Sequence, residues 1–108
     1  LKQAGDLLFL VGATRDELAG SHLAAVLEPD PARDPFAATS DLPRVDLAAA
    51  RVTFAALHAA IGAGLIRACH DLSEGGLAVA VAEMAIAGDL GVELELDAAG
   101  DATVALFS

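Results

Sequence analysis

The stretch Cys69–Gly88, C-H-D-L-S-E-G-G-L-A-V-A-V-A-E-M-A-I-A-G, carries the strongest structural signal in this 108-residue chain. It follows a short apolar run, passes through a polar turn with paired glycines, and continues into an alanine-rich stretch that favours a helix. The turn, residues 70–76, is also where several reactive side chains fall close together. We therefore expect a strand, a turn, and then a helix from Gly76 to Ala87.

Two interpretations of this turn stay open. In the first, the turn only starts the helix, because Asp71 and Ser73 are good N-cap residues and Glu74 suits a first helical turn. In the second, the paired glycines let the backbone approach a ligand, and the free N–H groups at the helix start attract a phosphate or another anion. The candidate residues facing such a ligand are His70, Asp71, Ser73, Gly75 and Gly76.

Composition and charge exclude several classes of protein. The length fits one domain, and the 56% of apolar residues argues against disorder. The formal charge of −10 argues against nucleic acid and anionic membranes as partners, and no apolar run is long enough to span a membrane. A single cysteine, Cys69, excludes an internal disulfide, and no zinc-ligand spacing is present. We expect a cytoplasmic protein without a metal site of its own.

The remaining patterns predict further helices and strands around the central stretch. Ser21 and Asp46 are expected to cap helices at 22–27 and about 47–63, with Gly62 and Gly64 as stop signals for the second. Apolar runs predict strands at 6–12, 65–69, 92–96 and 103–107. This order predicts an α+β fold, with helices packed on a mixed, mostly antiparallel sheet.

The expected core and loops follow from the same patterns. The second helix should bury a stripe containing Leu47, Phe54 and Ile61, and the helix from Gly76 should bury Leu77, Ala80, Val81 and Met84. The proline-rich segment 28–45 is expected to be an irregular surface loop. Cys69, His58 and Glu83 are interpreted as packing or solvated residues, because no motif gives any of them a partner.

The central stretch resembles the H-D-[LV]-S-[ED]-G-G-L-A signature of phosphoribosylformylglycinamidine synthase of the PurL type. D-L-L-F-L-V-G-A-T-R-D-E-L-A-G-S, which begins at Asp6, and P-R-V-D-L, which begins at Pro43, resemble two further landmarks of that family, in the family's order. The chain departs from the family pattern at Ala19 and at His22-Leu23. The resemblance implies that residues 1–108 form a single C-terminal domain related to that of AIR synthetase, the second of two in a longer polypeptide.

The resemblance also implies a reaction and its partners. The family converts formylglycinamide ribonucleotide, ATP and glutamine-derived ammonia to formylglycinamidine ribonucleotide in purine biosynthesis. ATP and Mg²⁺ are held mainly by domains outside this chain, so we assign no catalytic residue and expect no cofactor on the fragment alone. The implied partners are the N-terminal ATP-binding domains of the same polypeptide, a glutaminase subunit or domain, and a small accessory subunit.

Two alternatives stay open beside that function. One is another enzyme of the AIR synthetase superfamily, such as selenophosphate synthetase, thiamine phosphate kinase or the hydrogenase-maturation enzyme. The other is a non-catalytic module that pairs with a neighbouring domain and holds an auxiliary nucleotide. The start on Leu1 without methionine and the apolar end at 104–107 are what we expect of a piece of a longer chain.

Overall fold

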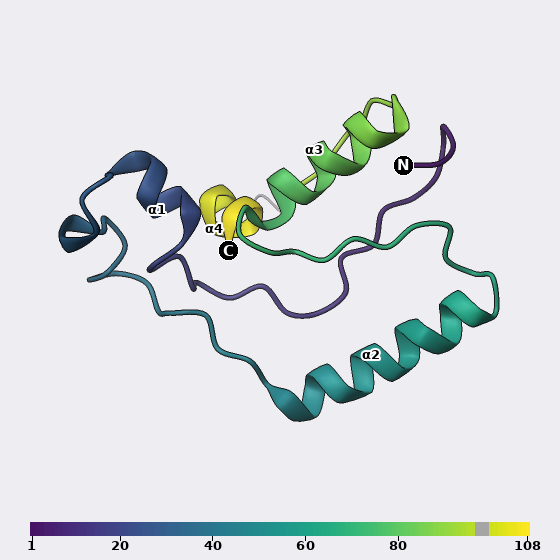
Figure 1. Ribbon diagram of the computed structural model, residues 1–108, viewed down its shortest axis with the longest axis horizontal. Helices are drawn as coiled ribbons and strands as arrows, with labels where there is room; N and C mark the ends of the chain where they lie inside the picture. The colour runs from purple at the N-terminus through teal and green to yellow at the C-terminus, as the bar shows by residue number, and fades with distance from the viewer. Residues whose placement is uncertain (97–99) are drawn as a thin grey trace.

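The computed structural model describes residues 1–96 and 100–108, and their regular structure is entirely helical (Figure 1). Within these ranges no strand occurs, so the predicted α+β fold with a mostly antiparallel sheet is wrong. The elements in chain order are α1 (His22–Leu27), the 3-10 turn η1 (Pro31–Arg33), α2 (Leu47–Gly62), α3 (Gly76–Gly88) and α4 (Ala102–Phe107).

Local signals place α1 and α2 where the sequence predicts them. The hydroxyl of Ser21 accepts a hydrogen bond from the amide of Ala24 at 3.1 Å, which caps α1. The carboxylate of Asp46 accepts from two amides of the first turn of α2, each at 3.0 Å. At the other end of α2, Gly64 has φ +71 and the amide of Leu65 donates back to an α2 carbonyl. This is the Schellman arrangement, in which a left-handed glycine ends a helix.

The predicted strands at 6–12, 65–69 and 92–96 are extended segments without a paired neighbour. Their apolar side chains are exposed: Leu7 and Phe9 keep 78% and 80% of their surface, and even the alternating 92–96 segment buries neither face. A strand exists only when a second backbone offers a ladder of N–H and C=O groups. The described residues supply no such ladder to these segments, so the apolar pattern alone does not produce a sheet.

The predicted strand at 103–107 is wrong in a different way, because these residues form α4. The carboxylate of Asp101 accepts a hydrogen bond from the amide of Thr103 at 2.7 Å and starts the helix. Thr103 and Val104 have a modest preference for strands, but an N-cap and packing against α3 outweigh that preference. The packing of α3 against α4 is the closest between helices in the described residues.

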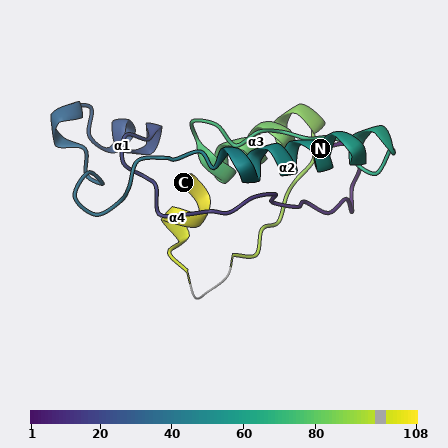
Figure 2. The same ribbon diagram turned by 90° about the horizontal axis from the view of Figure 1, so that it is seen from below.

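The buried core is small. It consists of Leu18, Ala19, Ala24, Ala80 and Val81. Burial of Ala80 and Val81 on α3 is as predicted, whereas the stripe predicted on α2 is exposed, and no residue of α2 is buried. In Figure 1, α2 lies along the edge opposite α3, and in Figure 2, α4 lies to one side of α1, α2 and α3. The radius of gyration is 15.4 Å, above the roughly 13 Å of a compact domain of this length.

Apart from the short 3-10 turn η1, the proline-rich segment 28–45 is irregular, as predicted, but it is anchored to the core. Ser40 accepts a hydrogen bond from the amide of buried Leu18 at 2.6 Å and donates to Asp16 at 2.6 Å. The carbonyl of Asp41 accepts from the amide of Ala19 at 3.3 Å. The end of this loop therefore supplies the backbone partners that the buried pair 18–19 needs.

Candidate functional site

The turn at 70–76 lies between the extended segment that follows α2 and the first residue of α3. The N-cap of α3 is Gly75, and it makes no side-chain cap hydrogen bond. The contact that closes the turn is between backbones, from the amide of Gly76 to the carbonyl of Ser73 at 3.4 Å. The interpretation of Asp71 or Ser73 as a side-chain cap is therefore wrong.

Gly76 is needed for packing inside the chain. It is buried, and its φ of +62 lies in the left-handed region that side chains with a Cβ disfavour. A Cβ atom at this position would lie 2.7 Å from the carbonyl oxygen of Leu106 and 2.7 Å from the Cα of Phe107. The approach of α4 thus explains a glycine here without any ligand.

The acidic and hydroxyl groups of the turn face solvent. Ser73 is exposed, and the side chains of Asp71 and Glu74 keep 85% and 76% of their surface. The carboxylate of Glu74 lies 3.7 Å from Nδ1 of His22, the first residue of α1. The Ser73 hydroxyl and the amides at the start of α3 are the hydrogen-bond donors that the turn offers to a ligand.

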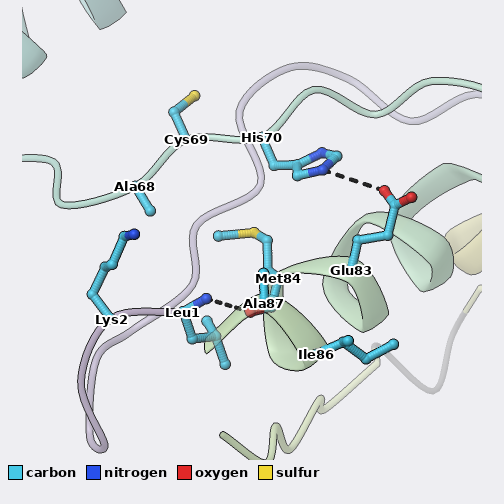
Figure 3. A pocket seen from close by; sticks show the side chains of 9 residues that line it. All are labelled: Leu1, Lys2, Ala68, Cys69, His70, Glu83, Met84, Ile86 and Ala87. Atoms are coloured by element: carbon cyan, nitrogen blue, oxygen red, sulfur yellow. Dashed lines mark hydrogen bonds and ion pairs between the residues drawn. The ribbon is translucent and has the colours of Figure 1, made fainter. Parts of the chain in front are cut away.

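His70 is the best-connected side chain of the candidate set. Its Nδ1 lies 2.7 Å from the backbone carbonyl of Asp71, and its Nε2 lies 3.3 Å from the carboxylate of Glu83 on α3 (Figure 3). Sequence reasoning treated Glu83 as a boundary or solvated residue. His70 precedes α3 by several residues in a turn without regular structure, so no spacing along the chain indicated this contact.

A cavity of about 440 Å³ opens beside this pair. Met84 and Ala87 give it an apolar wall on α3, and Lys2 and Cys69 lie across from them (Figure 3). The thiol of Cys69 is exposed and points away from α3 in this view. Among the described residues, no group of three or more His, Cys, Asp or Glu side chains is placed to hold a metal ion.

The candidate residues therefore lie in different environments. His70 is held between the chain and Glu83, Gly76 is packed under α4, and Asp71 and Ser73 remain on the surface beside Gly75. None of the helices in the ranges 1–96 and 100–108 has the length and apolar character that crossing a bilayer requires.

Comparison with known proteins gives a consistent result. The model of the family "AIR synthase related protein, C-terminal domain" matches residues 3–108. Subunit PurL of phosphoribosylformylglycinamidine synthase from Mycobacteroides abscessus is 45% identical over 106 residues, which is 98% of this chain and 13% of that protein. The corresponding subunit from Moorella thermoacetica is 43% identical over 95 residues, which is 88% of this chain and 12% of that protein. No solved structure matches. The chain spans about an eighth of the length of these relatives.

Proposed function

The chain belongs to the family of AIR synthase related C-terminal domains, and we propose that it acts as such a domain within a PurL-type subunit of phosphoribosylformylglycinamidine synthase, in purine biosynthesis. The observation that carries the proposal is the 45% identity to a PurL subunit over 98% of the chain. The resemblance to PurL-type proteins predicted from the Cys69–Gly88 motif is confirmed by these relatives.

The proposed reaction is the one that the family resemblance implies. The full-length protein would convert formylglycinamide ribonucleotide to formylglycinamidine ribonucleotide, using ATP and ammonia released from glutamine by a glutaminase subunit or domain. We place this chain as the second C-terminal domain of that polypeptide, in the cytoplasm, with the small accessory subunit as a further partner. In this proposal the domain supplies no catalytic residue.

ATP and Mg²⁺ belong, in this proposal, to sites built mainly by the ATP-binding domains. The described residues offer little to either group. The approach to Gly76 is filled by α4, and the polar part of the turn exposes Asp71, whose carboxylate would repel a phosphate. Only Ser73 and the first amides of α3 are suited to an anion, and they would serve as an edge of a cleft that a neighbouring domain completes.

A second candidate role, a module that pairs with a neighbouring domain, is favoured by one observation. Large exposed apolar side chains lie on the segment 7–11 and on α2, where Leu47, Phe54 and Ile61 share one face, and α2 buries none of its residues. An apolar helix face is normally packed against another element. Covering these surfaces with the ATP-binding domains of the same polypeptide would stabilise the domain by about 25 cal/mol for each Å² of apolar area removed from water.

The deciding experiment uses the full-length protein with its glutaminase. Formylglycinamide ribonucleotide, ATP, Mg²⁺ and glutamine are supplied together, and formylglycinamidine ribonucleotide and ADP are measured by mass spectrometry. We expect product only when formylglycinamide ribonucleotide, ATP, Mg²⁺ and a nitrogen source are all present, and an ammonium salt should serve as that source in place of glutamine. Absence of product from a folded, complete assembly would overturn the proposed reaction. Product formation that survives loss of the apolar side chains of α2 would overturn the pairing role.

A further inference from the structure

We propose that residues 1–6 form a joint between this domain and the polypeptide ahead of it, clamped between the last turns of α3 and the extended segment 65–69. Gly88 and Arg67 are the positioning residues of this joint. The proposal rests on the proposed function for one assumption, that another part of a PurL subunit precedes residue 1. The partner that the joint serves is therefore a neighbouring domain of the same polypeptide.

The first contact joins the start of the chain to α3. The backbone nitrogen of Leu1 donates a hydrogen bond to the carbonyl of Met84, and the chain begins beside the C-terminal half of α3 (Figure 1, Figure 3). In a longer polypeptide this nitrogen belongs to a peptide bond and keeps one proton to donate. The contact therefore does not depend on a free amino group.

Gly88 makes room for this approach. A Cβ atom at Gly88 would lie 2.9 Å from both the nitrogen and the carbonyl carbon of Leu1, and closer still to its carbonyl oxygen. Backbone conformation does not require a glycine here, because Gly88 is the last residue of α3 and the left-handed residue after it is Asp89, with φ 50. The glycine at position 88 is thus explained by the packing of Leu1.

The second contact holds residues 1–6 from the other side. The guanidinium of Arg67 donates to the carboxylate of Asp6 at 2.8 Å and to the side-chain oxygen of Gln3. The amide of Asp6 donates to the carbonyl of Gln3 at 3.2 Å, and Gly5 between them has φ 85, so residues 3–6 form a tight turn. Arg67 therefore fastens a closed turn to the segment 65–69.

This joint contacts both flanks of the candidate turn at 70–76. The segment 65–69 leads into that turn and α3 leads out of it, and residues 1–6 bind to both. A shift of the polypeptide ahead of Leu1 is therefore transmitted to each flank. The joint sets the position of the turn relative to the neighbouring domain.

The first test measures the placement of the two domains in the full-length protein without substrates. Spin labels are attached at Ala82→Cys, an exposed position of α3, and on the domain that precedes residue 1, with all other cysteines replaced by serine. Gly88→Ala should broaden the distribution of distances between the labels, because the added Cβ displaces Leu1. Gly62→Ala is the matched control. It changes the last residue of α2, where a Cβ meets no atom within 4 Å, and should leave the distribution unchanged.

Amide hydrogen exchange gives the local readout at Leu1 and Asp6, whose amides donate to backbone carbonyls. Exchange at Leu1 should become at least about fivefold faster in Gly88→Ala, as expected when a packed site is overfilled. Exchange at Asp6 should become about two- to fivefold faster in Arg67→Gln, which removes a partly exposed ion pair. Arg51→Gln, an exposed position of α2, should change neither rate.

Arg67→Gln adds no atom beside α3 and should also broaden the distance distribution, so it serves if Gly88→Ala does not fold. Unchanged exchange at Leu1 or Asp6 in folded variants would overturn the proposal. An unchanged distance distribution in spite of faster exchange would overturn it as well. If both measurements give the expected result but the full-length protein forms no formylglycinamidine ribonucleotide, the proposed reaction is wrong and the joint stands.

Discussion

A Cβ atom added to Gly76 would lie 2.7 Å from the carbonyl oxygen of Leu106, although the two residues belong to different helices. This relationship makes the glycine at the start of α3 part of the α3–α4 packing. The same glycine belongs to the motif by which the family is recognised, so one residue serves both as a marker in the sequence and as a contact in the structure.

We expect Gly76→Ala to destabilise the protein by at least about 1–2 kcal/mol, the cost of a left-handed backbone with a Cβ, and by more if α4 is displaced. Chemical denaturation of the full-length protein measures this change. Gly62→Ala is the matched control, because a Cβ there meets no atom within 4 Å and alanine is the better helix former. Equal stability of the two variants would contradict the packing role of Gly76.

Ser40→Ala should destabilise the protein by about 1–3 kcal/mol, because it leaves the amide of buried Leu18 without its partner. The same variant removes the hydrogen bond from Ser40 to Asp16. Thermal unfolding provides the measurement. Thr39→Ala, one residue earlier on an exposed part of the loop, should change stability by less than about 0.5 kcal/mol. A similar loss in both variants would show that the loop is not anchored at Ser40.

Asp46→Ala should loosen the first turn of α2. The carboxylate accepts hydrogen bonds from the amides of Ala48 and Ala49, and loss of such a cap costs about 0.5–2 kcal/mol. Since α2 buries no residue in this chain, its first turn depends strongly on the cap. Faster amide exchange at residues 48–50 is the expected result, and Asp46→Asn, which keeps the acceptor, should exchange at close to the wild-type rate.

Phe54→Ser tests the pairing of this domain with the rest of a longer polypeptide. Phe54 keeps 68% of its surface here, so by this structure alone the change should cost little. If a neighbouring domain covers α2, the full-length protein should lose about 3–5 kcal/mol, as when a buried phenylalanine is removed. Arg51→Ser, on the same helix, is the control for lost helix propensity. A loss no larger than that of Arg51→Ser would mean that α2 stays exposed.

The features that local interactions control could be predicted from the sequence. Ser21 starts α1, and Asp46 and Gly64 bound α2, because an N-cap and a left-handed residue after the helix act within a few residues of the helix they bound. The prolines of 28–45 likewise predicted irregular structure. The motif at 69–88, together with the landmarks that begin at Asp6 and Pro43, was sufficient to place the chain among its relatives.

Contacts between distant residues could not be predicted in this way. The segments 6–12, 65–69 and 92–96 have apolar patterns typical of strands. Such a pattern indicates that side chains favour burial, but it does not supply the second backbone that a sheet requires. For the same reason the pattern at 103–107 did not reveal that Asp101 and α3 would make it helical.

The same distinction between local and long-range contacts applies to the candidate site. The sequence by itself determined which residues crowd the turn at 70–76 and which family the chain belongs to, because both depend on neighbours along the chain. Only the tertiary structure decided that Gly76 packs under Leu106 and that Glu83 faces His70. Those pairs depend on how two helices and a turn meet in space, and a linear pattern contains no information about that approach until a partner surface is present.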